Sequence, residues 1–163
     1  MRTMRRLALY GLAASPFFMG LGSLVNGWWP LNIMFMLLVA CLMLYLADQG
    51  GSANTWAAAL VFIVGGAYVE FWWFALAFCY GAWWYCKSPS TTALIAWTLA
   101  CASLYAVNHN FWALAAMPII LAAPLVKLQM PRWRHAFYVY YPAHLATLLL
   151  ISSILERHVL LRR

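Results

Sequence analysis

Long apolar stretches with almost no charge constrain the fold of this chain more than any other feature. Of 163 residues, 67% are hydrophobic and only 8% are charged, whereas soluble domains are about 45–50% apolar and about 25% charged. So few charged side chains cannot provide a surface that water tolerates, and we expect lipid to surround the protein. The sequence therefore predicts an all-α, polytopic integral membrane protein that contacts the lipid bilayer directly.

Hydropathy indicates one transmembrane helical domain, residues 1–163, with expected spans at 7–25, 31–47, 67–86, 91–107, 110–126 and 137–155. The stretch from Thr55 to Cys86 contains a single charge, Glu70, and is too long for one span at about 1.5 Å per residue. Gly65–Gly66 is its natural break. We therefore expect a short helix or re-entrant element at 54–65, which gives six or seven membrane elements in a helical bundle.

The net charge of +7 comes from basic residues at the ends of these spans, as expected for loops held at a cytoplasmic face. No run resembles a nucleic-acid-binding patch, so no nucleic-acid partner is expected. Counting positive charges does not decide between six and seven crossings, and the orientation stays open. The four cysteines lie in or beside apolar spans without CxxC spacing, which favours packing over a metal site or a disulfide.

Polar residues inside spans are the candidates for function, because they are costly in a membrane. Glu70 follows Gly65–Gly66 in "GGAYVEFWW" and is either an interfacial residue or a buried acid that orients a base or a substrate amine. Asn32 is either a helix cap, an interhelical hydrogen-bonding residue or part of a site. Arg6 is an ordinary cytoplasmic anchor unless a ligand engages it.

His144 is the histidine that falls inside an expected span, in "FYVYYPAHLATLLL" (137–150). Proline is tolerated in the first turn of a helix, so a helix beginning near Pro142 would place His144 beside free backbone N–H groups. Such a position suits a carbonyl oxyanion or a phosphate. The alternative is a proline-kinked helix with His144 bonded to a neighbouring helix. The expected helical face comprises Phe137, Tyr141, His144 and Leu148, with Tyr140 four residues before His144.

Two blocks, "PLNIMFMLLVACLMLYLAD" (30–48) and "FYVYYPAHLATLLL" (137–150), resemble the TraX family of polytopic inner-membrane proteins. "RRLALYGLAASPFF" and "AYVEFWWFALAFCYGAWWY" are also similar to regions of that family. The residues that match the first block are Asn32, Ile33 and Phe35. Those that match the second are Phe137, Tyr138, Tyr141, Pro142 and His144.

The resemblance implies a multi-pass acyltransferase of the bacterial inner membrane, with acetyl-CoA as acyl donor and no metal. Its acceptor would be the N-terminal amine of conjugative pilin or of another small membrane protein. The residues expected to be catalytic are His144, Tyr141 and Glu70. Those expected to bind substrate are Arg6, Asn32, Tyr138 and Tyr140.

The sequence departs from the family pattern at its start. Family members usually begin with one or two further spans, the first of which carries an Asp-His pair, whereas this sequence begins "MRTMRRLALY" and contains no such pair. The expectation is either a reading frame assigned from a late start codon or a shortened relative. Two other functions stay open: a catalytically degenerate family member that acts as a membrane assembly partner, and a small transporter with a midplane site at the helix breaks.

Overall fold

The computed structural model describes residues 1–21, 28–126 and 135–160, and the side chains of the last segment as far as Leu155. Apart from one isolated bridge between Leu31 and Val69, the regular elements in these ranges are helices, which confirms the all-α fold class. They are α1 (Arg2–Gly20), α2 (Ile33–Gln49), α3 (Ser52–Tyr68), α4 (Trp72–Lys87), α5 (Thr91–Ser103), α6 (Tyr105–Asn108), α7 (Trp112–Ala122), the 3₁₀ turn η1 (Ala123–Leu125) and α8 (Ala136–Leu160).

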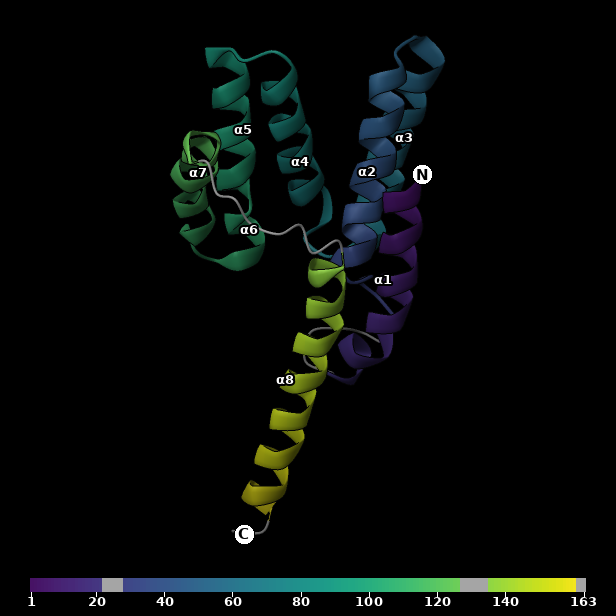
Figure 1. Ribbon diagram of the computed structural model, residues 1–163, viewed down its shortest axis with the longest axis vertical. Helices are drawn as coiled ribbons and strands as arrows, with labels where there is room; N and C mark the ends of the chain where they lie inside the picture. The colour runs from purple at the N-terminus through teal and green to yellow at the C-terminus, as the bar shows by residue number, and fades with distance from the viewer. Residues whose placement is uncertain (22–27, 127–134, 161–163) are drawn as a thin grey trace.

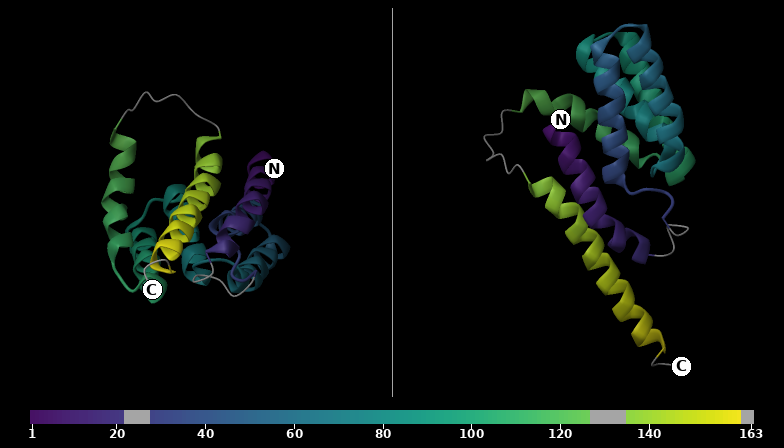
Figure 2. Two further views of the ribbon diagram at one scale, coloured as in Figure 1. Left: turned by 90° about the horizontal axis from the view of Figure 1, so that it is seen from below. Right: turned by 90° about the vertical axis from the view of Figure 1, so that its right-hand side faces the viewer.

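The helices form two hairpins and one parallel pair (Figure 1). The hairpins are α2–α3 and α4–α5, and α7 packs on the outer side of α5. The pair is α1 and α8, which run side by side in the same direction and leave the C-terminal half of α8 projecting beyond the hairpins (Figure 2). This projecting end carries exposed apolar side chains such as Leu150, Ile151 and Ile154, which suits contact with lipid.

Local sequence signals explain where the hairpin helices begin and turn. Asn32 caps α2 and Ser90 caps α5, each accepting a hydrogen bond from a backbone N–H of the first turn. Between α2 and α3 the chain reverses at Gly50 and Gly51, whose φ angles are +67° and +80°. Glycine adopts positive φ without a steric penalty, so these two residues permit the short α2–α3 connection.

The largest core lies where α2, α3 and α4 meet. Its buried members are Met36, Ala40, Met43, Ala58, Val69, Ala75 and Leu76. A second cluster joins α1 to α8 through Ala14, Phe18 and Leu145. The third joins α4, α5 and α7 through Trp97, Cys101 and Met117. The core thus runs through helix pairs rather than around one centre, and α2 is the element that connects the α1–α8 pair to the hairpins.

The expected break at Gly65–Gly66 is wrong, because α3 continues through both glycines to Tyr68. The glycines serve close packing instead. A Cβ on Gly65 would lie 2.5 Å from Val39 Cγ1 of α2, and one on Gly66 would overlap the indole of Trp73. The chain breaks at Val69–Phe71, so the short element expected at 54–65 is a helix of 17 residues.

The expected start of the last helix near Pro142 is also wrong. The helix α8 begins at Ala136 and runs through Pro142, which places His144 in its third turn and away from the free N–H groups of the helix start. Proline inside a helix removes one backbone donor, and transmembrane helices tolerate this more often than soluble ones do. A helical start therefore cannot be read from this proline alone.

Two stretches are long and apolar enough to span a membrane: Thr91–Asn108, which comprises α5 and α6, and Ala136–Leu155 of α8. Shorter apolar helices are Ile33–Gln49, Ser52–Tyr68 and Trp112–Leu125. The end of the first expected span, at 22–25, and the basic loop at 127–134 lie outside the described residues. The number of membrane crossings stays a prediction.

Candidate functional site

The N-terminal end of α2 is fastened to α1 by the side chain of Asn32, which is 1% exposed. Its Oδ1 accepts from the Met34 N–H at 3.1 Å. Its Nδ2 donates to the Gly11 carbonyl at 2.9 Å and to the Ser15 hydroxyl at 3.2 Å. Asn32 therefore acts both as a helix cap and as an interhelical hydrogen-bonding residue, the two structural roles considered for it from the sequence.

The backbone of Glu70 is held beside this helix end by the bridge between Leu31 and Val69. Leu31 N donates to the Tyr68 carbonyl at 2.7 Å, and Glu70 N donates to the Leu31 carbonyl at 2.9 Å. The Glu70 carboxylate consequently interacts with the backbone N–H of Ile33, the first residue of α2. A carboxylate at this position is favoured, because the unpaired N–H groups and the helix dipole are positive there.

Tyr141 reaches the same point from α8. Its hydroxyl lies close enough to the Glu70 carboxylate and to the Ile33 backbone for both to act on it electrostatically. We call this group of Glu70, Tyr141 and the Ile33 N–H the Glu70 site. Its members come from α2, from the α3–α4 connection and from α8, so the fold brings together two residues, Glu70 and Tyr141, that are far apart in the sequence and were both expected to be catalytic.

Glu70 lies outside the helices, in the connection Val69–Phe71, and it is partly buried. Burial raises the pKa of its carboxyl, and the interaction with the Ile33 N–H opposes part of that rise. A carboxylate with a raised pKa is a stronger base than an exposed one. In the Glu70 site, Glu70 is therefore the group that is able to accept a proton from a substrate.

Glu70 opens onto a cavity of about 620 Å³, a size typical of small-molecule sites. Four of its lining residues are aromatic, and Asn108 is a second polar side chain; the walls come from α1, α4, α6 and the connections before α2 and α4. The lining residues include Phe18, Phe71, Trp72, Phe74 and Val107. Phe18 also packs in the cluster that contains Tyr141, so the cavity lies next to the Glu70 site.

The backbone beside Glu70 is strained. Phe71 and Trp72 have φ angles of +63° and +52°, a region that bulky side chains rarely adopt. Such conformations persist only where surrounding contacts enforce them, and they are frequent at functional sites. The contacts are present here, since Phe71 packs on the α2–α3–α4 core and Trp72 packs against Trp29 and Trp73.

The other residues of the expected site lie elsewhere. His144 is exposed on α8 and stacks on Tyr140, with ring centroids 5.6 Å apart and planes 8° from parallel. Tyr138 instead stacks on Tyr10 of α1 at 5.4 Å. The face of α8 that packs is thus rotated from the expected one and centres on Tyr138, Tyr141 and Leu145.

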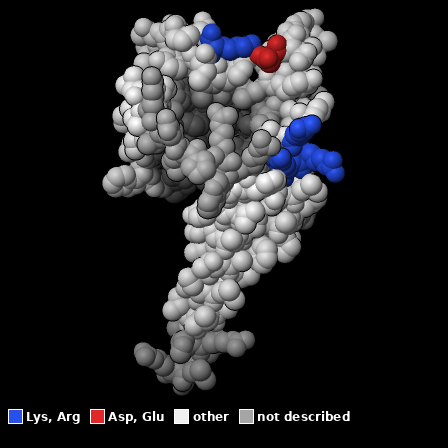
Figure 3. Space-filling view, viewed as in Figure 1, with Lys and Arg blue, Asp and Glu red and all other residues white. Residues whose placement is uncertain are grey.

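Arg6 belongs to a basic cluster with Arg2 and Arg5 at the start of α1, visible as one blue patch in Figure 3. Together with Leu9 these arginines line a shallow pocket of about 320 Å³. Among the residues that the structure describes, the ion pair found is that of Lys87 with Asp48, so no carboxylate neutralises this cluster there. An anionic group such as a phosphate would find unpaired positive charge at this end of α1.

Sequence reasoning missed three parts of this arrangement: the Ile33 N–H, the strained Phe71–Trp72 step and the α6 wall of the cavity. A backbone donor has no side-chain signature, and neither aromatic residue favours positive φ. Asn108, in "VNHN", was not predicted as a site residue, because a polar residue in a break between spans carries no signal that it faces a cavity. In the described part of the chain, no three residues among His, Cys, Asp and Glu cluster as a metal site would require.

These features define the class of protein: it is all-helical, with two candidate membrane-spanning helices and with a carboxylate and a tyrosine close to the start of a helix. The chain belongs to the TraX family, since residues 1–152 match the family model described as TraX protein. Membership implies a membrane protein with a role related to pilin acetylation. Searches of curated proteins and of solved structures found no match.

Proposed function

We propose that this protein is a membrane-embedded acyltransferase that moves an acetyl group from acetyl-CoA to an amine of pilin or of another small membrane protein. We place it as one multi-pass helical domain, residues 1–163, in the bacterial inner membrane. The observation that carries the proposal is that Tyr141 lies near Glu70 at the start of α2, beside a cavity of about 620 Å³. Family membership supplies the reaction class.

In the proposed reaction, the amine nitrogen attacks the thioester carbonyl carbon, and a C–N bond forms. Glu70 takes the proton that the amine releases. The Tyr141 hydroxyl donates a hydrogen bond to the carbonyl oxygen as it becomes negatively charged. The C–S bond then breaks, and the coenzyme thiolate leaves and receives the proton from Glu70. Atoms and charge balance, and the carboxylate is regenerated.

The remaining residues receive binding and supporting roles. Arg6, with the neighbouring arginines, binds the phosphates of the coenzyme, because no carboxylate among the described residues neutralises that cluster. Tyr138 and Tyr140 contact the substrates from α8, and Asn32 holds α2 so that the Ile33 N–H faces Glu70. His144, exposed and three residues after Tyr141, exchanges protons between the Glu70 site and its surroundings.

The test is an acetyl-transfer assay with the purified protein in a lipid nanodisc, labelled acetyl-CoA and pilin, read by intact mass. Glu70→Gln keeps an acceptor for the Ile33 N–H but removes the base, so we expect the rate to fall by about 10²–10⁴. Asp48→Asn, which converts a half-exposed carboxylate at the other end of α2 to an amide, is the matched control and should retain the wild-type rate. Full activity of Glu70→Gln together with loss in His144→Ala would contradict the proposal and move the base to the exposed face of α8.

A non-catalytic family member is the second candidate, and one observation favours it. Asn32 and Glu70 both satisfy backbone donors at the start of α2, which is a sufficient structural reason for their presence. In that case the protein would act as an assembly partner in the membrane. No acetyl transfer by the wild-type protein, with binding to pilin retained, would support this second function.

A further inference from the structure

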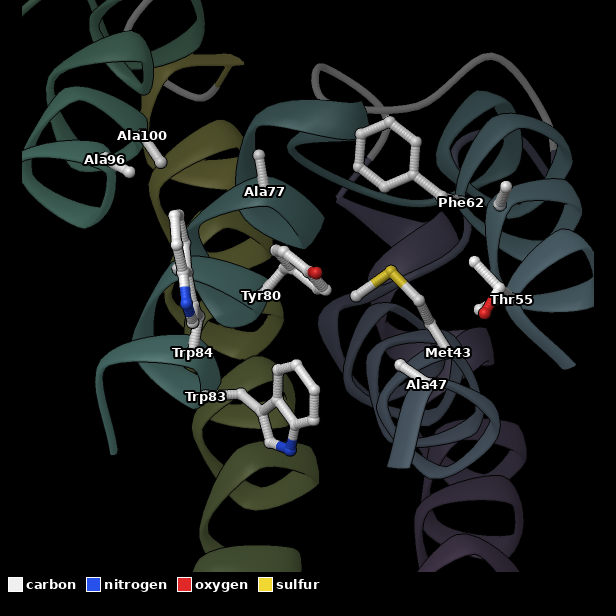
Figure 4. Close-up of a pocket in the computed structure, with 13 residues that line it drawn as sticks. Met43, Ala47, Thr55, Phe62, Ala77, Tyr80, Trp83, Trp84, Ala96 and Ala100 are labelled. Carbon is white, nitrogen blue, oxygen red and sulfur yellow. The ribbon is translucent and has the colours of Figure 1, made fainter. Parts of the chain in front are cut away.

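A second cavity, separate from the Glu70 site, lies between the α2–α3 and α4–α5 hairpins (Figure 4). Its volume is about 510 Å³. Tyr80, Trp83 and Trp84 of α4 form one wall, and Met43 of α2 faces them from the other. Because the Glu70 site is at the N-terminal end of α2 and this cavity extends to its C-terminal end, the two are distinct.

Small residues keep this cavity open. No side chain from the opposite walls fills it, because the positions that face it include Ala47, Ala58, Ala59, Ala77, Ala96 and Ala100. Gly81 lets α5 approach α4 closely: a Cβ there would lie 2.9 Å from Trp97 Cα. This cavity, which we call the apolar groove, is therefore a consequence of small residues along four helices, α2, α3, α4 and α5.

The lining favours a hydrocarbon over a polar ligand. Two hydroxyl-bearing side chains line the cavity, Thr55 and Tyr80, and the Thr55 hydroxyl already donates to the Gly51 carbonyl at 3.0 Å. The rest of the lining consists of alanine, glycine, methionine and aromatic side chains. An apolar chain loses no hydrogen bond on entering such a site, whereas a polar ligand would.

One end of the cavity is charged. Asp48 follows Ala47 at the end of α2, and Lys87 lies over the Trp83 ring, 5.0 Å from its centroid. Asp48 and Lys87 form an ion pair that joins the two hairpins, and both side chains are about half exposed. Figure 3 shows them side by side above a hollow between the hairpins. The cavity is therefore bordered, at the C-terminal ends of α2 and α4, by one anionic and one cationic side chain.

We propose that this groove binds one acyl chain of a phospholipid whose headgroup carries both a phosphate and an ammonium, such as phosphatidylethanolamine. The chain lies along the alanine-lined floor. The phosphate pairs with Lys87 and the ammonium with Asp48, which replaces the ion pair within the protein by two ion pairs with the headgroup. A headgroup with a phosphate alone would leave Asp48 without its cation, and the groove should therefore discriminate against phosphatidylglycerol.

Native mass spectrometry of the detergent-solubilised protein tests the proposal with phosphatidylethanolamine and phosphatidylglycerol added in equal amounts. The wild type should retain phosphatidylethanolamine about fivefold better, the ratio expected from one exposed ion pair. Asp48→Asn should abolish this preference, because it removes the partner of the ammonium. That position is exposed, so the variant should fold normally.

Ala96→Phe fills the floor of the groove and should lose both lipids. Its matched control is Leu99→Phe on the same helix, at a position that is 65% exposed and not part of the lining; that variant should bind as the wild type does. Equal retention of the two lipids by the wild type, or wild-type retention by Ala96→Phe, would overturn the proposal. A dimer that Ala96→Phe dissociates would also overturn it, by assigning the groove to a second copy. These readouts do not depend on acetyl transfer.

Discussion

Replacing Asn32 by alanine should separate the start of α2 from α1. The side chain makes three hydrogen bonds while 1% exposed: one to the Met34 N–H as a helix cap and two to Gly11 and Ser15 of α1. Loss of a cap costs about 1 kcal/mol. An interhelical hydrogen bond in a membrane protein contributes about 0.6 kcal/mol on average. With two such bonds, the free energy of unfolding should fall by about 2 kcal/mol.

The assay is equilibrium unfolding in mixed micelles of a mild detergent and sodium dodecyl sulfate, followed by tryptophan fluorescence and circular dichroism. Asn54→Ala is the matched control, because Asn54 makes one exposed bond, to the Gly50 carbonyl at 2.9 Å, and should cost less than about 0.5 kcal/mol. Asn32→Ser should lie between the two variants, since a serine retains the cap and loses the bonds to α1. If Asn32→Ala unfolds within about 0.5 kcal/mol of the wild type, the inferred role of Asn32 in joining α1 to α2 is wrong.

Three further predictions concern the Glu70 site and the packing of α3. Because the pKa of Glu70 is raised above the ordinary value of about 4.3, acetyl transfer should fall as the pH drops through the raised pKa, measured as a pH–rate profile. The raised pKa also means that the ionised Glu70 carboxylate destabilises the folded protein. Glu70→Gln should therefore be at least as stable as the wild type at neutral pH, and the difference in free energy of unfolding should vanish in acid, where Glu70 is protonated. Lower stability of Glu70→Gln at neutral pH would contradict this prediction. Tyr141→Phe should lower the rate by about 10²-fold through loss of a donor to the oxyanion, whereas Tyr45→Phe, at an exposed position of α2, should not. Gly65→Ala should destabilise the protein by about 1 kcal/mol in the same unfolding assay, because an overpacking cost of about 2 kcal/mol exceeds a helix-propensity gain of about 1 kcal/mol. The control is Gly20→Ala, where the added methyl group meets a flexible leucine side chain. Stabilisation by Gly65→Ala would refute the close contact with α2.

The helical fold class and most helix positions could be read from the sequence, because hydropathy and the scarcity of charge depend on composition along the chain. The errors arose at residues with two possible uses. Gly65 and Gly66 signal either a break or a close contact, and Pro142 signals either a helix start or a tolerated interior proline. Which use applies depends on the neighbouring helix, and no local pattern contains that information.

For the candidate site, the sequence likewise predicted several residues but not how they are arranged. The sequence by itself marked Asn32, Glu70, Tyr141 and His144, because polar groups are few and costly in an apolar chain. Only the tertiary structure decided that Glu70 and Tyr141 lie near the Ile33 N–H while His144 stays exposed. The physical reason is that α8 runs parallel to α1 with one particular rotation about its axis. That rotation is set by packing of Leu145 against Ala14 and Phe18, contacts between the two ends of the chain.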